Sequence, residues 1–406
     1  MSTTPFRGRR LLVLGAGHHQ IPLIQRAQAL GVHVIAADNR PENPGHALAD
    51  ESRLVSTTDL EAVLEAARAL RLDGILTYGS DVSAPAAAYV AETLGLPGNP
   101  FAAGVLLQRK DRLRELQAQL GLPHPAFVAA GDVETLLDAV RRTDLAFPLL
   151  LKPADASGSK GQTVVGSPAA AAAAFAHARA DSRCGVVVAE RVLSPDLLEL
   201  VGDVYVHDGT LRFGHYGHNY FAAEGFPRVP AGEIMPGFFG EDVVAELDRQ
   251  IEAVVRAAGV RTGGMNFDAV VADGRVHLLD VGLRCGGNYL SELIRLSTDV
   301  DLAAAAVHAA LGSEYAVPAR HVRDARWAVS YVVNSMESGR FRGFTVSEDI
   351  RPWLVRQVSF LQPGDAVKPY VRGDHGVGIC LFALPGREEA EAVYPRLPAC
   401  VRVHVG

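Results

Sequence analysis

The 406-residue sequence has few of the features that mark membrane, secreted or nucleic-acid-binding proteins. No segment approaches the roughly 20 apolar residues of a membrane helix, and the first apolar run, about four residues, is too short for a signal peptide. Basic residues are outnumbered by acidic ones, 39 to 46, and form no block, which argues against nucleic-acid binding. Four cysteines lie far apart without a CxxC pair. We therefore expect free thiols in a reducing cytoplasm.

The first hundred residues alternate apolar, strand-like segments with helical ones. Strands are expected at LLVLGAG, VHVIAAD and LDGILTYG, and helices at HQIPLIQRAQALG, DLEAVLEAARALR and SAPAAAYVAETLG. This alternation predicts an α/β fold with a doubly wound parallel sheet. The segment GLPGNP (95–100) then reads as a linker.

A glycine-rich turn, GAGHHQ (15–20), follows the first expected strand. Amide groups at such a strand-to-helix turn attract anions, so a carboxylate or phosphate site, a dinucleotide site with Asp38, and a simple tight turn all stay open. The dinucleotide pattern is incomplete, because the third glycine position is Gln20. Ligands of open α/β sheets collect at strand ends. Candidate substrate-binding residues in this region are His18, Gln20, Ser80 and Asp81.

The segment FPLLLKPADASGSKGQTVV (147–165) carries Lys152 on an apolar strand, followed by a Gly/Ser loop. A buried lysine needs an anionic partner, either a protein carboxylate or a ligand. The loop lacks the Walker pattern GxxxxGK[ST]. Its glycines nevertheless allow close backbone approach, and Lys160 adds positive charge. A strand lysine beside this loop favours a phosphate ligand over an ordinary hairpin turn.

Two later segments are expected to form hairpins with Asp-Gly turns, at Asp208 and at Asp273. In the second hairpin, antiparallel pairing places Asp268 and Asp280 roughly opposite each other on one face. Facing carboxylates repel each other unless a cation lies between them, and Mg²⁺ prefers one or two carboxylates together with phosphate oxygens. Arg284 follows on the same side, where it could clamp a phosphoryl group. The alternative is that both aspartates flank turns and face water.

Six segments in this order resemble the ATP-grasp ligases, the superfamily that includes D-alanine–D-alanine ligase, biotin carboxylase and the amino-acid ligases. The segments, within residues 11–311, are QRKDRLRELQAQLGLP, FPLLLKP, SGSKG, VVVAERVL, NFDAVV and LLDVGLRCGGN. The resemblance implies a Rossmann-like domain (1–105), an ATP-grasp domain (106–320, lid about 125–190) and a strand-rich α+β C-terminal subdomain (321–406). The last part either packs over the active site or supports a homodimer.

The resemblance also implies roles for individual residues. Those expected to contact ATP are Lys110, Lys152, Ser157, Gly158, Ser159, Lys160, Gly161, Glu190, Val192 and Glu199, with Asp203 behind Glu199. Lys152 and Arg284 would act catalytically, Arg284 by stabilising an acyl phosphate. Asp268 and Asp280 would hold Mg²⁺, or Mn²⁺ in its place.

This sequence departs from the family pattern at its metal site. Both metal acids are aspartate where the family mostly has glutamate, and the asparagine ligand of the family is replaced by Gly282. A second metal ion is therefore in doubt. Asn266 and Asn288 are candidates to replace the missing ligand.

The implied activity joins a small carboxylate, activated by ATP as an acyl phosphate, to an amine. ADP and phosphate are released. Alternatives are an enzyme of carboxyphosphate or carbamoyl-phosphate type, an NAD-dependent oxidoreductase using GAGHHQ, and a non-catalytic ATP-binding protein. Further candidates for substrate contacts are His215, His218, Arg228 and Asn288. The sequence names neither the carboxylate nor the amine.

Overall fold

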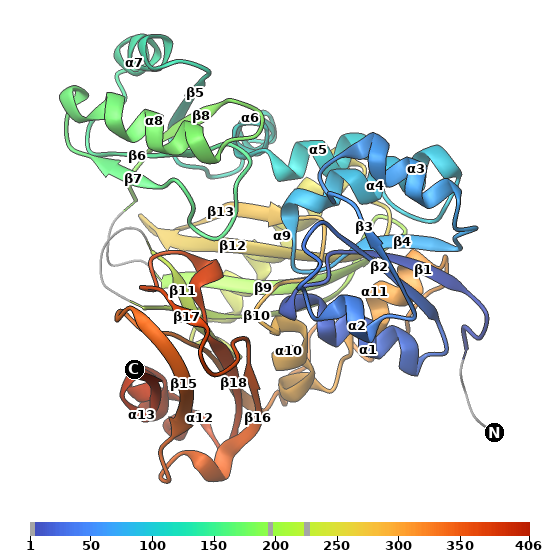
Figure 1. The fold of residues 1–406 in the computed structure, drawn as a ribbon. Helices are drawn as coiled ribbons and strands as arrows, with labels where there is room; N and C mark the ends of the chain where they lie inside the picture. The colour runs from blue at the N-terminus through green and yellow to red at the C-terminus, as the bar shows by residue number, and fades with distance from the viewer. Residues whose placement is uncertain (1–4, 194–197, 223–227) are drawn as a thin grey trace.

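The computed structural model describes residues 5–193, 198–222 and 228–406 (Figure 1). Within these residues the strands form four sheets. No described helix is both long enough and apolar enough to cross a membrane. The predicted α/β fold, with an N-terminal parallel sheet and a strand-rich C-terminal region, is confirmed.

The N-terminal sheet is fully parallel, in the order β3-β2-β1-β4. Its strands are β1 Arg10–Leu14, β2 His33–Asp38, β3 Glu51–Leu54 and β4 Gly74–Thr77. The helices around it are η1 His18–Gln20, α1 Ile21–Ala29, α2 Gly45–Leu48, α3 Leu60–Arg68, η2 Asp81–Ser83 and α4 Ala84–Leu94. Alternate residues of β1 point to opposite faces of the sheet. Leu12 and Leu14 therefore join the core of α3 and α4, while Leu11 and Val13 face α1.

Helix α11 (Leu302–Ala310) covers the α1 face of the N-terminal sheet, although it lies more than 200 residues further along the chain (Figure 1). A side chain at Gly74 on β4 would collide with the backbone carbonyl of Ala310. This close approach shows that glycine is needed there for packing. The N-terminal sheet is thus fixed directly against the part of the chain that carries Arg284.

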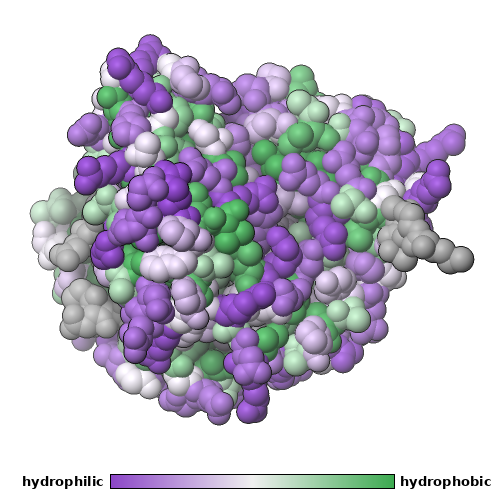
Figure 2. All heavy atoms as spheres, turned by 90° about the horizontal axis from the view of Figure 1, so that it is seen from below, coloured by the Kyte–Doolittle hydropathy of each residue, from purple (hydrophilic) through white to green (hydrophobic). Residues whose placement is uncertain are grey.

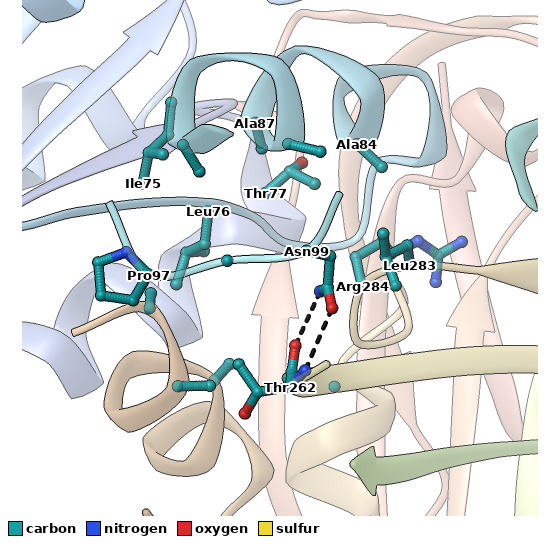
Figure 3. Close-up of a pocket in the computed structure, with 18 of the residues that line it drawn as sticks. Ile75, Leu76, Thr77, Ala84, Ala87, Pro97, Asn99, Thr262, Leu283 and Arg284 are labelled. Carbon is teal, nitrogen blue, oxygen red and sulfur yellow. Dashed lines mark hydrogen bonds between the residues drawn. The ribbon is translucent and has the colours of Figure 1, made fainter. Parts of the chain in front are cut away.

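The linker 95–100 has no helix or strand, as predicted, but Asn99 within it is firmly held. Its amide group donates to Thr262 O at 2.7 Å and accepts from the backbone amides of Arg261 and Thr262 at 2.7 and 3.1 Å. Figure 3 shows the two bonds to Thr262 beside a cavity between the N-terminal sheet and the start of β12 (Gly263–Ala272).

We expect Asn99→Ala to lower the free energy of unfolding by about 1–3 kcal/mol, because three hydrogen bonds are lost and two backbone amides lose their acceptor. Urea denaturation followed by circular dichroism would measure this change. Asn39→Ala, at an exposed position, is the matched control. Equal midpoints for the two variants would contradict the assignment of Asn99 as a clamp between the domains.

Two helices and a small antiparallel sheet follow the linker. Helix α5 (Phe101–Gln108), which sequence analysis missed, precedes α6 (Lys110–Gln119). The sheet has the order β5-β8-β6-β7, with strands β5 Phe127–Ala130, β6 Leu149–Pro153, β7 Thr163–Val165 and β8 Val187–Arg191. Its helices are α7 Val133–Arg142, η3 Pro168–Ala170 and α8 Ala171–Asp181. In Figure 1 this unit lies above the large sheet, the position expected of a lid.

The large sheet has eight strands within the described residues, in the order β13-β12-β9-β10-β11-β14-β18-β16. The strands besides β12 are β9 Leu198–His207, β10 Thr210–Phe221, β11 Pro230–Met235, β13 Arg275–Gly282, β14 Trp327–Val333, β16 Leu354–Ser359 and β18 Gly378–Leu384. Both predicted hairpins are present, β9–β10 and β12–β13. Asp208 and Asp273 begin their turns with φ of 48° and 51°, a conformation that aspartate tolerates. Helices α9 Glu241–Ala258 and α10 Leu290–Thr298 complete this part.

The C-terminal region extends the large sheet, because β14, β16 and β18 belong to it. Its remaining elements are η4 Arg351–Trp353, η5 Gly373–His375, α12 Arg387–Val393, η6 Tyr394–Arg396 and α13 Leu397–Cys400, with a small sheet of β15 Gly339–Val346, β17 Ala366–Val367 and β19 Val401–Val405. The sheet thus crosses the predicted boundary at residue 320 without a break. That boundary stays a prediction.

On the face seen in Figure 2, hydrophobic residues occur in small groups separated by hydrophilic ones. A contiguous apolar patch of several hundred Å² would be typical of a protein interface. This face therefore adds no support for a homodimer, which stays a prediction.

Candidate active site

Asp268 on β12 and Asp280 on β13 are direct register partners, as the Asp-Gly turn predicted. Burial and the neighbouring charge of Asp280 raise the pKa of Asp268 to about 6. Burial also opposes ionisation of Asp280, but Lys110 outweighs it and holds the pKa of that carboxyl below its ordinary value. The pair thus combines an ionised carboxylate with a carboxyl group that would ionise fully if a cation came between them.

Lys110 opens helix α6, and its Nζ lies 2.8 Å from Asp280 Oδ2 and 2.9 Å from Ala156 O. Burial opposes its charge, but Asp280 raises its pKa above the ordinary lysine value. Sequence analysis expected Lys110 to contact ATP phosphates, and the structure places its side chain beside one of the two predicted metal acids. The anionic partner expected for a buried lysine is, in this structure, a protein carboxylate.

Lys152 on β6 is also paired with a protein acid, because its Nζ lies 2.7 Å from Glu190 Oε2. Arg114 on α6, fully buried, lies 3.0 Å from the other oxygen of Glu190. Burial opposes ionisation of Glu190, but the two cations hold its pKa at about 2. Sequence analysis missed Arg114, which has no signal beyond its place on a helix that also carries Lys110.

The loop 157–161 connects β6 to β7 and contacts the C-terminal region as well as the lid. Ser159 Oγ donates to Arg228 O at 2.7 Å, and Gly373 N donates to Gly158 O at 3.4 Å. Lys160 Nζ lies 4.0 Å from Asp374 Oδ2. Gly161 packs against Pro153 and lines neither of the cavities described next.

Two cavities meet at the aspartate pair. The first, beneath the lid, is lined by both predicted lysines, three loop residues and the strand end after β8. Its walls include Lys110, Lys152, Ser157, Gly158, Ser159, Glu190, Val192, Leu193, Glu199, Arg228, Asp268, Leu279 and Asp280. Glu199 lies 3.3 Å from Arg228, yet burial raises the pKa of Glu199 to about 8. The predicted nucleotide residues, apart from Lys160 and Gly161, are therefore brought to one cavity.

The second cavity lies on the other side of the aspartate pair and contains the Arg284 side chain. Its walls include His19, Asp81, Lys160, Asn219, Glu233, Asn266, Asp268, Asp280, Gly282, Arg284, Asn288 and Asp374. Both cavities share Ser157, Gly158, Pro230, Asp268 and Asp280. Arg284 Nη2 forms an ion pair with Asp81 Oδ2 at 2.6 Å, which joins the first domain to this site.

Gly282 leaves space that Asp81 fills. A side chain at position 282 would collide with Asp81 Oδ1, and Gly282 pairs in register with Asn266. The Asn266 amide donates to Asp203 Oδ1 at 3.0 Å and to Gly202 O at 3.1 Å. Asn266 is therefore engaged with the strand next to it. The structure accordingly adds no evidence for a second metal ion.

Five predicted substrate residues lie outside both cavities of the described structure. His18 stacks on Phe360, and Ser80 contacts Ser83. Gln20 donates to Tyr78 O at 2.5 Å, which closes the glycine turn instead of exposing it. Their positions at strand ends are as predicted, but the adjacent loops bury or occupy their polar groups.

The two histidines of GHYGHNY are also held by protein groups. His215 Nε2 lies 2.9 Å from Ser297 Oγ, and His218 Nε2 accepts from Phe238 N at 2.7 Å. Burial lowers the pKa of His215 to about 3 and that of His218 to about 4, so both are neutral at pH 7. Alternation along β10 places them on opposite faces, as predicted, but both have structural partners. Of the predicted substrate residues, Arg228 lines the first cavity, and Asp81 and Asn288 line the second.

The turn GAGHHQ uses Asp38 to close on itself. Asp38 accepts from Ala16 N at 3.0 Å and from the amide of Asn43 at 2.9 Å. In a dinucleotide site this acid would be free for a ribose. The turn is therefore a packed structural turn, and His19 within it reaches the second cavity, where its Nδ1 accepts from Asn288 N at 3.2 Å.

Comparisons with known proteins agree with this geometry. Residues 24–98 match the ATP-grasp N-terminal domain family. The structure resembles the L-amino acid ligase from Bacillus licheniformis with a TM-score of 0.82, 22% identity, and coverage of 98% of this chain and 99% of that one. The chain therefore has the ATP-grasp fold. A biotin carboxylase domain from Hydrogenobacter thermophilus, in complex with MgADP and bicarbonate, resembles it with a TM-score of 0.77 at 15% identity, covering 98% and 91% of the chains.

Curated relatives of this chain include formate-dependent phosphoribosylglycinamide formyltransferases. The one from Prochlorococcus marinus is 32% identical over 209 residues, which are 50% of this chain and 53% of the relative. In that comparison the chain spans about half the length of the curated relative. The one from Parasynechococcus marenigrum is 26% identical over 97% of this chain and 98% of the relative.

Proposed function

We propose that the ATP-grasp protein is an ATP-dependent ligase that joins a small carboxylate to an amine. The observation that carries this proposal is that Asp268 and Asp280 line two cavities at once, one beneath the lid and one around Arg284. A phosphoryl group that moves from a nucleotide in the first cavity to a second substrate in the other has to pass the residues that both cavities share. The likeness to ATP-grasp ligases supports the same reaction class.

The first cavity has the groups that a nucleotide triphosphate needs. Lys110 and Lys152 supply positive charge at its inner end, and loop residues 157–159 offer backbone amides near the phosphates. Val192 and Leu193 offer an apolar wall for a base, and Glu199 lies where a ribose hydroxyl could bind. Glu190, predicted at the adenine pocket, lines the same cavity and also lies 2.7 Å from Lys152 Nζ, which it would hold in position.

The aspartate pair fits Mg²⁺ bound together with a phosphate. In the described parts of the chain, no three acid, histidine or cysteine side chains come together as a complete metal cage. Mg²⁺ does not need one, because one or two carboxylates with water and phosphate oxygens satisfy its octahedral geometry. Asp268 and Asp280 would hold the ion, which would neutralise charge on the phosphates.

In this proposal a substrate carboxylate oxygen attacks the γ-phosphorus, and the bond from that phosphorus to the bridging oxygen of ADP breaks. The product is an acyl phosphate, which lies beside Arg284. A neutral amine then attacks the acyl carbon and the amide C–N bond forms, the nitrogen gives up one proton to a base or to water, and phosphate leaves with the electrons of the C–O bond. The chain contributes alignment and charge neutralisation, so no nucleophilic side chain is required.

The proposal predicts phosphate release that depends on both substrates. The test is a phosphate-release screen of the Mg²⁺-loaded protein with ATP, carboxylates including formate, acetate and L-amino acids, and a panel of amines. We expect release only when one carboxylate and one amine are both present. Release with bicarbonate alone would instead support the carboxyphosphate type. Nucleotide binding without turnover in any mixture would contradict the ligase proposal.

A further inference from the structure

Glu233 on β11 is a buried acid at the wall of the second cavity that sequence analysis did not single out. Its side chain is only 4% exposed, and it lines the same cavity as Asp268 and Arg284. Ser330 on β14 holds it from behind, because Ser330 Oγ donates to Glu233 Oε2 and accepts from Glu233 N at 2.9 Å. The carboxylate is therefore fixed in direction, with its polar end at the cavity wall.

The positive groups of the second cavity each lie beside an acid other than Glu233. Arg284 pairs with Asp81 at 2.6 Å, and Lys160 lies 4.0 Å from Asp374. His19 is neutral at pH 7, because burial and then the nearby charges of His18 and Arg284 lower its pKa to about 4. Within the described residues, Glu233 has no ion-pair partner. A buried carboxylate without a cation is costly, so the site is suited to a ligand that brings positive charge.

We propose that Glu233 binds the ammonium group of the amine substrate, and that this amine carries no phosphate. The inference rests on the proposed ligase function and adds to it the class of the acceptor. The curated relatives are named for an acceptor with a phosphate group, phosphoribosylglycinamide. The walls of the second cavity carry five acids, Asp81, Glu233, Asp268, Asp280 and Asp374, against two cations, Lys160 and Arg284, so a phosphate on the amine would add to an excess of negative charge.

The surroundings of Glu233 explain why the cation has to come from the ligand. Burial raises the pKa of Glu233 to about 7, hydrogen bonds from Ser330 and Asn288 act in the opposite direction, and Asp268 and Asp203 raise the pKa further. Tyr370 adds a phenol on the C-terminal side. None of these groups is cationic. An ammonium ion bound at this position would stabilise the charged carboxylate and be stabilised by it. Before it attacks the acyl carbon, the ammonium group would pass one proton to that carboxylate.

The alternative is a structural role, in which Glu233 only ties β11 to β14 through Ser330. Glutamine at this position keeps the shape and can still hydrogen-bond to Ser330, but it removes the charge. Aspartate keeps the charge with a shorter reach. The two substitutions therefore separate charge recognition from a structural tie, because the structural role predicts that Glu233→Gln is the milder change.

The test is isothermal titration of the protein saturated with Mg²⁺ and the non-hydrolysable analogue AMPPNP. The probes are ethanolamine, putrescine and L-alanine, with O-phosphoethanolamine as the phosphate-bearing match for ethanolamine. We expect at least one phosphate-free amine to bind, at least tenfold weaker binding in Glu233→Gln, and partial recovery in Glu233→Asp. Glu337→Gln, at an exposed position, should bind like the wild type.

Three outcomes would overturn the inference: no binding of any probe, unchanged affinity in Glu233→Gln, or tighter binding of O-phosphoethanolamine than of ethanolamine. A separate measurement tests the proposed ligase function without the amine. Positional isotope exchange in ATP, measured with carboxylates and without any amine, reports acyl phosphate formation alone. Exchange together with unchanged amine binding in Glu233→Gln would reject the role of Glu233 and leave the ligase function standing.

Discussion

Replacing Asp280 by asparagine is expected to lower turnover by about a thousandfold or more while the protein still folds. The substitution removes one of two carboxylates that face both cavities, and with it the charge that would hold a metal ion against the phosphates. Loss of one preorganised charge-stabilising group in an active site typically costs roughly 10²–10³ in rate, and loss of a metal ligand adds to that. The measurement is ATP- and amine-dependent phosphate release at saturating Mg²⁺.

The fold should survive Asp280→Asn because Lys110 keeps a second contact, to Ala156 O. The side chain of Asp280 is 30% exposed, so water screens part of the lost attraction. We therefore expect a loss of only about 1–2 kcal/mol in the free energy of unfolding. Calorimetric titration with ATP in the presence and absence of Mg²⁺ would show whether the metal-dependent part of binding is the part that is lost.

A matched control comes from the same hairpin. Asp273 begins the turn between β12 and β13, is exposed, and pairs with Arg191 at 2.9 Å. Asp273→Asn keeps a residue that tolerates the positive φ of this position. Its turnover should match the wild type. Near-normal turnover in Asp280→Asn would defeat the assignment of the aspartate pair, and equal loss in both variants would point to a distorted hairpin instead.

The pairing of Asp268 with Asp280 could be predicted because it depends on local rules. An Asp-Gly turn fixes the register of a hairpin, and register decides which side chains face each other. The same reasoning placed Lys152 on a strand before a glycine-rich loop. Where a site is built from neighbouring strands, its geometry can be worked out from the sequence.

Contacts between distant segments could not be predicted in this way. Asp81 and Arg284 are separated by 203 residues, and His19 and Asn288 by 269. These pairs depend on how α11 packs against the N-terminal sheet, which no periodic pattern specifies. Asp81 was chosen for its position at a strand end, but its partner was not foreseen.

Glu233 and Arg114 were missed for a different reason. Each lies in a segment whose pattern indicates only a strand or a helix, and a charged residue there reads as solvent-facing. Burial of both emerges only when β14 pairs with β11 in the large sheet and when α6 packs against β13. The candidates His215 and His218 lie outside both cavities for the converse reason, because their strand is buried on both faces.

The largest effect on stability is expected for Glu190→Gln. Glu190 lies between Lys152 and Arg114, at 2.7 and 3.0 Å, and all three side chains are almost fully buried. The substitution leaves two buried cations without the acid that offsets their charge. Removing one partner from a buried ion pair costs about 3–5 kcal/mol. Urea denaturation at pH 7 would measure this loss.

The pH dependence of the free energy of unfolding of the wild type should show the same interaction of Glu190 with Lys152 and Arg114. The carboxyl of Glu190 titrates near 4.5 in the unfolded chain and near 2 in the folded protein. The ionised Glu190 therefore stabilises the folded state fully above pH 4.5, and this stabilisation is lost as the pH falls through 2. In Glu190→Gln this part of the acid-induced loss of stability should be absent, so the two stability curves converge at low pH.

Glu134→Gln supplies the control for Glu190→Gln, because Glu134 lies on α7 of the same lid unit and is exposed. It should shift the free energy of unfolding by no more than about 0.5 kcal/mol. ATP with Mg²⁺ should stabilise Glu190→Gln more than it stabilises the wild type, because the phosphates bring negative charge to Lys152. If Glu190→Gln proves as stable as Glu134→Gln, the two cations are not held by Glu190, and the triphosphate site loses its fixed inner wall.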